Sequence, residues 1–199
     1  MLKIEDCKVV FASVGLIGVL LFASSTLGLV LRLPGGEKFS ELWVLGPERM
    51  AEDYPFNVRV GENYSVYVGV GNHMGFSAYY VVYVKFRNQT ESLPNATAGT
   101  SSPLPPLFEF RLFVEDGKSW EAPLRFSFSN VSFSENRSFV GSLMINGVAF
   151  NVDKWASWDV ENNGYYYQLF IELWIYNVEP AAFEFHNRFV GLWLNMTGV

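Results

Sequence analysis

Cysteine is nearly absent from this sequence. The single cysteine, Cys7, lies near the N-terminus and ahead of a long apolar run. The rest of the chain therefore cannot form an internal disulfide, which is unusual for an exported domain in an oxidising compartment. The same absence excludes a cysteine nucleophile and Cys-x-x-Cys metal sites from that region. Cys7 itself is either lipidated beside a membrane or an unmodified thiol.

Basic residues are also scarce. The chain has 14 Lys and Arg against 20 Asp and Glu, a net charge of −6, and no basic cluster that would meet phosphates. We therefore exclude nucleic acid as a partner.

Motifs of enzymes and metal sites are missing as well. There is no Gly-x-Ser-x-Gly and no phosphate-binding glycine loop, and His73 and His186 are the only histidines. We expect no catalytic residue, no cofactor and no metal site. The alternative is an enzyme acting on envelope glycans, with Glu172 and Glu184 as its candidate carboxylate pair.

One long stretch carries no charge at all. Val9–Leu31 runs for 23 residues, enough to cross a hydrocarbon core of about 30 Å as a helix. Two alternatives are a signal peptide cleaved near Ala23–Ser25 and a buried helix of a soluble domain. We predict a cytoplasmic tail over 1–8, a transmembrane signal-anchor over 9–33, a linker over 34–38 and one extracellular domain over 39–199.

Asn-x-Ser/Thr sequons are over-represented after this run. There are six, whereas random placement of 14 Asn and 22 Ser and Thr would give about 1.5. They begin at Asn63, Asn88, Asn95, Asn130, Asn136 and Asn195. Their position predicts N-glycosylation outside the cell, with the N-terminus inside; Asn195 is set apart because it falls in a predicted strand. Glycosylation without disulfides suggests an archaeal surface protein.

The remaining sequence is typical of short strands. Period-two alternation of apolar residues is clear in Leu107–Val114 and Tyr165–Tyr176, and Asn146-Gly147 predicts a two-residue hairpin turn. Ala78–Phe86 is almost continuously apolar, which predicts cover on both faces, whereas the Ser- and Pro-rich segment Asn88–Pro106 predicts an exposed loop. We predict an all-β fold, an antiparallel β-sandwich that is immunoglobulin-like in the loose sense.

Four aromatic residues are candidates for contact with a ligand or partner. Trp155 and Trp158 precede Asn162-Asn163-Gly164 and are expected in a loop, and Tyr165 and Tyr166 follow it. Their rings are suited to stacking on sugar faces, to anchoring a protein partner, or to capping the open end of the core.

Several segments carry a family resemblance. They are Phe39–Pro47, Ala51–Pro55, Val60–Glu62, Val68–His73 and Phe183–Phe189. Together they resemble an archaeal membrane-protein family known as domain of unknown function 1616. The resemblance implies an outward-facing β domain and an archaeal origin, and it implies no activity and no catalytic residue. Gly61 and Gly71 also fit a simple fold signature, because glycine suits turns where a side chain would clash.

These observations predict a membrane-anchored, N-glycosylated archaeal cell-surface protein with an interaction or structural role in the envelope. The alternatives are a carbohydrate-binding module on the cell surface and an accessory subunit of a membrane complex. The expected partners are the lipid bilayer, N-linked glycans, and an envelope protein or a second copy of the chain. The expected location is the cell membrane, crossed once, with the C-terminal domain outside.

Overall fold

The computed structural model describes Lys8, residues 11–20 and residues 37–198. The chain divides into two compact units, Met1–Glu37 and Lys38–Val199. In the first unit, residues 11–20 are helical and their side chains are exposed. Among the residues that the structure describes, no helix is both long and apolar enough to cross a membrane. The remainder of the predicted span, most of the predicted tail and most of the predicted linker lie outside the described residues.

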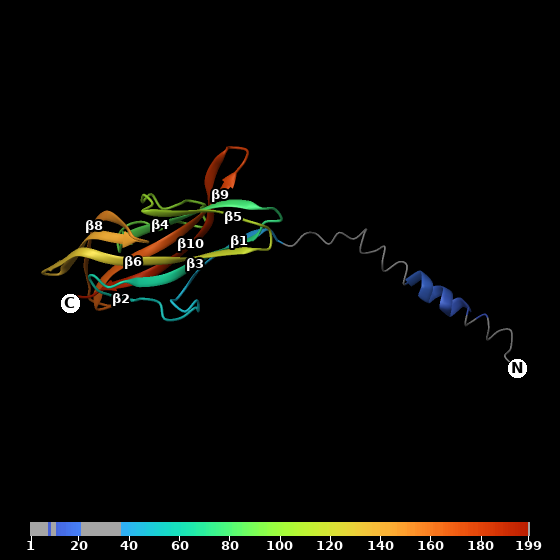
Figure 1. Ribbon diagram of the computed structural model, residues 1–199, viewed down its shortest axis with the longest axis horizontal. Helices are drawn as coiled ribbons and strands as arrows, with labels where there is room; N and C mark the ends of the chain where they lie inside the picture. Colours follow the sequence, from blue (N-terminus) through green and yellow to red (C-terminus); the bar gives the residue numbers. More distant parts are fainter. Residues whose placement is uncertain (1–7, 9–10, 21–36, 199) are drawn as a thin grey trace. The chain divides into compact units, whose positions relative to one another are not determined.

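The described part of the second unit is built from strands (Figure 1). They are β1 (Phe39–Leu45), β2 (Asn57–Val58), β3 (Tyr64–His73), β4 (Ala78–Asn88), β5 (Phe108–Val114), β6 (Ser119–Ser134), β7 (Arg137–Ile145), β8 (Val148–Asp159), β9 (Gly164–Asn177) and β10 (Ala182–Met196). The named strands pair antiparallel, except that β2 runs parallel to β10. The prediction of an all-β, antiparallel fold is confirmed.

The strands form one sheet that curls into two layers. One layer has the order β1-β3-β6-β7-β8, and the other has the order β2-β10-β9-β4-β5. The layers are joined where β8 pairs with β9 through Trp158↔Tyr165 and Asp159↔Gly164. The result is the predicted sandwich, immunoglobulin-like in the loose sense of two facing antiparallel layers.

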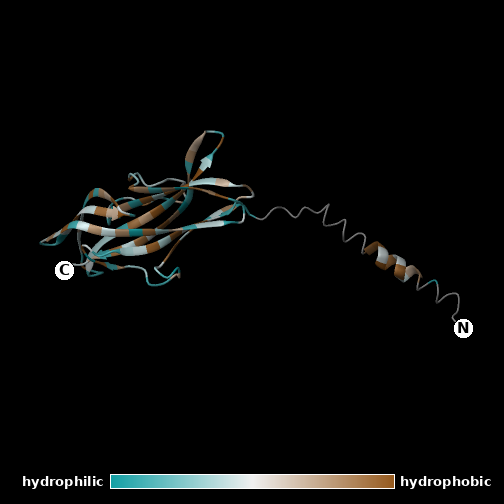
Figure 2. Ribbon diagram, viewed as in Figure 1, coloured by the Kyte–Doolittle hydropathy of each residue, from teal (hydrophilic) through white to brown (hydrophobic). Residues whose placement is uncertain are grey.

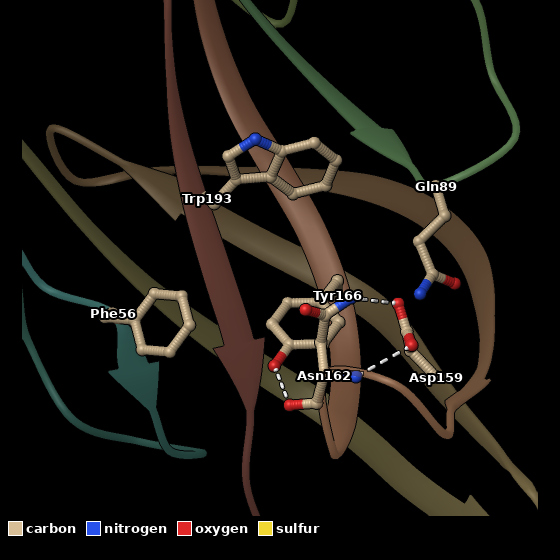
Figure 3. Close-up of a pocket in the computed structure, with 6 residues that line it drawn as sticks. All are labelled: Phe56, Gln89, Asp159, Asn162, Tyr166 and Trp193. Carbon is tan, nitrogen blue, oxygen red and sulfur yellow. Dashed lines mark hydrogen bonds between the residues drawn. The ribbon is translucent and has the colours of Figure 1, made fainter.

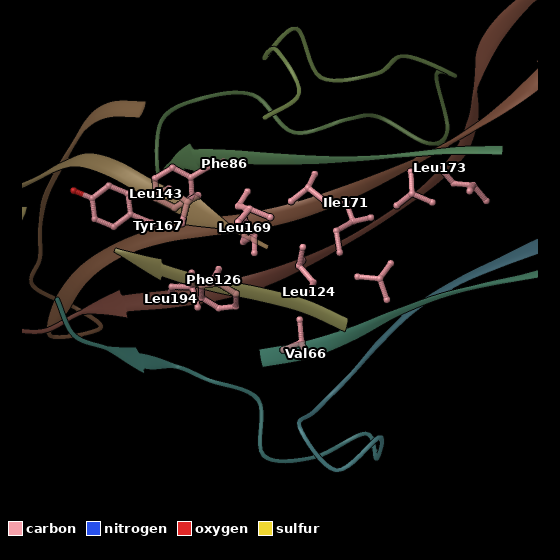
Figure 4. Packing of buried hydrophobic residues seen from close by; sticks show 14 of the residues in the cluster. Val66, Phe86, Leu124, Phe126, Leu143, Tyr167, Leu169, Ile171, Leu173 and Leu194 are labelled. Carbon is pink, nitrogen blue, oxygen red and sulfur yellow. The ribbon is translucent and has the colours of Figure 1, made fainter. Parts of the chain in front are cut away.

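The core fills the space between the layers (Figure 4). Hydrophobic and polar residues alternate along most strands (Figure 2), so one face of each strand turns inward. From β9, Tyr167, Leu169, Ile171 and Leu173 are buried, as their period-two spacing predicts. They meet side chains of the opposite layer, including Val66, Leu124, Phe126 and Leu143.

The structure corrects the prediction of a loop at Trp155–Trp158. These residues lie within β8, where Phe139 pairs with Trp155 and Arg137 pairs with Ser157. The register between β7 and β8 shifts near Gly141, opposite Asp153, whose φ of 46° is left-handed. The burial of β8 nevertheless alternates without a break through Phe150, Val152, Lys154 and Ala156. The apolar pattern ends at Lys154, which takes an inward position and pairs with Glu91 at 2.6 Å. The strand therefore continues beyond the point where its sequence pattern ends.

A long loop, residues 89–107, connects β4 to β5. A buried ion pair fixes this long loop to the outer face of β4 and β9. Lys85 Nζ lies 2.9 Å from Glu172 Oε2, and the two side chains are 4% and 0% exposed. The loop meets both charges through Ser102, whose N–H donates to Glu172 Oε1 (2.8 Å) and whose carbonyl accepts from Lys85 Nζ (2.9 Å). Val81 and Phe170 are fully buried. The predicted cover on both faces of β4 is confirmed.

A second buried polar cluster joins β1, β3, β4 and β10. The Ser40 hydroxyl lies 2.6 Å from the Tyr80 hydroxyl and 2.9 Å from His186 Nε2. Tyr80 in turn donates to Asn72 Oδ1 (3.1 Å). Ser40, Asn72 and His186 come from three of the segments that carry the family resemblance. The signature residues therefore converge in space and connect the two layers.

We predict that the Lys85–Glu172 pair is strongly coupled in stability. Glu172→Gln leaves Lys85 buried without its counter-charge, so the free energy of unfolding should fall by about 3–5 kcal/mol. Lys85→Met should cost a similar amount. The double variant Lys85→Met/Glu172→Gln should lose much less than the sum of the single losses, since no buried charge remains. Urea unfolding followed by tryptophan fluorescence measures all three.

The matched control is the exposed Glu109–Arg111 pair, whose closest N–O distance is 2.7 Å. Glu109→Gln should change the free energy of unfolding by less than about 1 kcal/mol. Strict additivity of the losses at Lys85 and Glu172 would contradict the interpretation.

We also predict acid sensitivity through His186. Burial, assisted by the nearby charge of Arg188, lowers the pKa of His186 below its usual value. Below a pH of about 6.5 the unfolded chain takes up a proton that the folded His186 resists, so the free energy of unfolding should fall as the pH drops. Above that pH His186 is neutral in both states and contributes no pH dependence.

Unfolding at pH 7.5 and pH 5.5 measures this effect. His186→Gln should remove part of the stability lost between the two values, whereas His73→Gln, at an exposed strand end, should leave the loss in place. An equal loss in the wild type and His186→Gln would contradict the assignment.

Candidate functional site

A hollow of about 470 Å³ opens beside β9 and β10. Its lining residues are Phe56, Gln89, Asp159, Asn162, Tyr166 and Trp193 (Figure 3). We call it the aromatic hollow. Tyr166 comes from β9 and Trp193 from β10, while Phe56 comes just before β2. Among the polar residues, Asp159 ends β8, Asn162 lies in the β8–β9 turn and Gln89 follows β4.

Strand alternation explains why these aromatic rings face outward. Tyr167 and Leu194 point into the core, so Tyr166 and Trp193, one position away on each strand, point to the opposite face. Trp193 is 41% exposed and Phe56 is 48% exposed. The ring centroids of Phe56 and Tyr166 lie 6.0 Å apart. In Figure 3, Phe56 lies on the side of the hollow away from Gln89 and Asp159.

The indole of Trp193 packs against the side chain of Arg87. The guanidinium of Arg87 lies 5.3 Å from the centroid of the Trp193 ring, within the range of a cation–π contact. Arg87 Nε donates to Gln168 Oε1 at 2.9 Å. Gly191 leaves space for this amide, because a Cβ there would lie 2.3 Å from Gln168 Nε2. The Trp193 ring therefore rests on a side chain that is itself held by a hydrogen bond to β9.

The polar side of the hollow is negatively charged. Asp159 Oδ1 accepts from the backbone N–H groups of Glu161 and Asn162, each at 3.0 Å, and Oδ2 accepts from Asn162 Nδ2 at 2.9 Å. The bonds from Asn162 lower the pKa of Asp159 from its usual value, so the carboxylate is ionised at neutral pH. The Tyr166 hydroxyl donates to the Asn162 carbonyl at 2.5 Å.

A second hollow lies beside the β6–β7 turn. It encloses about 610 Å³. Its lining residues are Ser134, Glu135, Asn136, Arg137, Trp155, Ser157 and Trp158. We call it the tryptophan hollow. Trp155 is 51% exposed and packs against Phe139, while Trp158 packs edge-on against Tyr165.

The structure places the four predicted contact residues at three different locations. Trp155 and Trp158 line the tryptophan hollow, Tyr166 lines the aromatic hollow, and Tyr165 packs against the core. Sequence analysis missed Trp193, although its alternation with Leu192 and Leu194 in a predicted strand marks it as outward-facing. It also missed Phe56, because only the pairing of β2 with the end of β10 brings that residue to the site.

The predicted sequons have different environments. Asn63, Asn95 and Asn136 are exposed and lie in turns or loops. Asn130 is also exposed, but it lies within β6 and its amide packs over Gly141.

The other two sequons have engaged amides. Asn88 Nδ2 donates to the Trp155 carbonyl, and Asn195 Nδ2 donates to Asn57 Oδ1 at 3.0 Å. Asn195 lies in β10, as the sequence predicted, and its Oδ1 accepts from Tyr165 N–H. In the folded chain Asn88 and Asn195 therefore act as hydrogen-bond bridges between strands.

The histidines and candidate carboxylates occupy separate places. Within the described residues, no three His, Cys, Asp or Glu side chains gather to hold a metal ion. His73 lies 3.6 Å from Glu41 at an exposed strand end. Glu172 is buried against Lys85, whereas Glu184 is exposed and accepts from Asn177. Glu172 and Glu184 do not face each other across either hollow.

Solved structures with a related arrangement of strands are distant. A beta-glucosidase from Listeria innocua is 11% identical, with a TM-score of 0.42, and the match covers 81% of this chain and 16% of that one. A CARDB domain from Pyrococcus furiosus, solved in complex with di-metal ions, is 10% identical, with a TM-score of 0.38 and coverage of 80% and 90%. No curated protein matches the sequence. These likenesses carry no functional assignment.

A family relationship is shown by sequence. Residues 33–137 match the family described as Domain of unknown function (DUF1616). The match spans more than half of the chain and includes every resembling segment except Phe183–Phe189. That segment supplies His186, which contacts Ser40 inside the matched region. The chain therefore belongs to the DUF1616 family.

Proposed function

We propose that the strand-rich unit binds carbohydrate in the aromatic hollow. The observation that carries the proposal is the presence of Trp193, Tyr166 and Phe56 around one concave site with amide and carboxylate groups on its other side. A sugar ring has an apolar C–H face and a rim of hydroxyl groups. Aromatic faces suit the first, and side-chain amides and carboxylates suit the second.

The charge of the site narrows the class of sugar. Among the residues that the structure describes, Asp159 is the only charged one that lines the aromatic hollow, and its carboxylate is ionised. Arg87 is buried behind Trp193. An acidic sugar would meet a negative charge without an exposed cation to balance it. The proposed ligand is therefore a neutral sugar, in which hydroxyl groups donate to the site.

We also propose where this binding takes place. The uncharged run Val9–Leu31 and the sequons that follow it support a single-pass membrane anchor with the strand-rich unit outside the cell, carrying N-linked glycans. The resemblance to an archaeal membrane-protein family and the near absence of cysteine support an archaeal envelope. The function is then non-catalytic attachment to a glycan of the envelope.

A second candidate function is binding of a protein partner, as an accessory subunit or structural component. Phe113 is 76% exposed and stacks on Tyr79 with centroids 4.2 Å apart. Phe183 packs edge-on against Tyr79, and Arg111 lies 5.5 Å from the centroid of the Phe183 ring. Exposed aromatic residues beside an arginine are typical of protein-interaction surfaces.

We predict that Trp193→Ala weakens sugar binding about tenfold, which corresponds to about 1.4 kcal/mol of lost stacking. Tyr166→Phe should have a smaller effect, since the ring remains. A glycan array identifies a neutral oligosaccharide that the purified full-length chain binds. Titration calorimetry with that oligosaccharide then measures the affinity of each variant.

Trp155→Ala is the matched control, because it removes a similarly exposed tryptophan, 51% against 41% for Trp193, from the other hollow. It should leave the affinity unchanged. The carbohydrate proposal fails if no neutral glycan binds, or if Trp193→Ala binds as well as the wild type. A stoichiometric protein that co-purifies in mild detergent would then favour the second function.

We predict that a protease added to intact cells reaches the strand-rich unit but not the N-terminal tail. A specific cleavage site inserted after Gly99, which is solvent-exposed in the long loop, should be cut, because the proposed orientation puts this loop outside the cell. The same site inserted after Lys3 should be cut only after the membrane is opened. Protection at Gly99 in intact cells, followed by cleavage after lysis, would reverse the proposed orientation.

A further inference from the structure

Asn136 lies at the tryptophan hollow, so a sequon and two indole rings share one site. The hollow is lined by Asn136, Trp155 and Trp158 together with polar residues of the β6–β7 turn. Asn136 is exposed at that turn. A group attached to its side chain would therefore start beside both rings.

The backbone fixes this juxtaposition. The Trp158 N–H donates to the Asn136 carbonyl at 2.8 Å, which attaches the turn to β8. Glu135 has a left-handed φ of 51°, as in a tight hairpin turn. Trp155 remains 51% exposed even though it packs against Phe139. The hollow therefore presents an aromatic surface that the described protein residues leave uncovered.

We propose that the first sugars of an N-glycan on Asn136 fill the tryptophan hollow and pack against Trp155 and Trp158. The inference rests on the proposed glycosylation of the outer domain. The covalent anchor places the sugar at a high effective concentration over the rings. Contact between an apolar sugar face and an indole removes both surfaces from water. The glycan therefore acts as a structural part of this end of the sandwich.

The linkage is an ordinary N-glycosidic bond. Asn136 Nδ2 bonds to the anomeric carbon of the sugar, and the bond from that carbon to the phosphate of a lipid-phosphate-linked oligosaccharide breaks. The lipid phosphate leaves with the bonding electrons, and the amide nitrogen loses one proton to a base. No oxidation or reduction takes place.

Asn136 is the sequon whose asparagine lines the tryptophan hollow. The side-chain amides of Asn88 and Asn195 already donate to other residues, so a sugar there would disturb strand contacts. Asn95 is exposed in the long loop, and its Oδ1 accepts from Ala98 N–H. Asn95 does not line the tryptophan hollow. It therefore supplies a matched sequon outside that hollow.

The experiment is a cycle of stability measurements on the full-length chain. The wild type, Asn136→Gln, Trp155→Ala and the double variant are produced in a host that N-glycosylates, with occupancy read by mass spectrometry. Asn136→Gln should lower Tm by about 2–4 °C when Trp155 is present, as expected for a single aromatic packing contact in a chain of this size. It should lower Tm by less in the Trp155→Ala background, where only Trp158 remains for the sugar to pack against.

Two controls make the result specific. Asn95→Gln, which also disturbs the hydrogen bond from Ala98 N–H, should change Tm by the same amount in both backgrounds. The same four proteins from a host without N-glycosylation should show no coupling between positions 136 and 155. Nuclear Overhauser contacts between sugar protons and the Trp155 indole should appear only in the glycosylated wild type.

The possible outcomes distinguish failure of the sugar packing from failure of the proposed N-glycosylation. A glycan on Asn136 that gives equal Tm shifts with and without Trp155, and no contact with the indole, would overturn the packing and leave the glycosylation intact. Occupied sequons elsewhere with a bare Asn136 on protein from native cells would also overturn it. Bare sequons throughout would instead remove the proposed glycosylation, and this inference with it.

Discussion

The buried pair of Lys85 and Glu172 is the constraint on which the outer face of the sandwich depends. Two charges removed from water are tolerated only if each is paired and hydrogen-bonded. The long loop supplies one hydrogen bond to each charge: the Ser102 carbonyl accepts from Lys85, and the Ser102 N–H donates to Glu172. The loop thus covers the outer face of β4 and β9, where Val81 and Phe170 are fully buried. By covering one part of this face it leaves another part open, and the aromatic hollow lies there.

Local pattern predicted much of this fold. Phe39–Leu45 is a strand within the predicted limits, and Asn146-Gly147 turns with two left-handed residues, at φ 47° and 84°. Alternation assigned the buried face of β9 correctly. The failures have two causes. In β8 an inward position is taken by Lys154, which pairs with Glu91, and an exposed one by Trp155, so residue type no longer marks the buried face. In β10 a register shift next to His186 breaks the period of two, and the strand begins ahead of it at Ala182.

The candidate site was harder to predict from the sequence than the fold was. Tyr166 was singled out, but Trp193 and Phe56 join it only through strand pairings between distant segments, which no local pattern encodes. Trp155 and Trp158 were expected to share a loop. They share a hollow instead, although they alternate on a strand, because the neighbouring turn of Asn136 bends beside them. Long-range pairing, rather than residue type, decides which aromatic rings meet.

The seam between the two layers is narrow. It consists of Trp158↔Tyr165 and Asp159↔Gly164, and each hollow takes one wall from it: Trp158 on one side and Asp159 on the other. The two hollows therefore share one corner of the chain, where β8 passes into β9. Adjacent residues of one short strand pairing, Trp158 and Asp159, thus supply a wall to two different hollows.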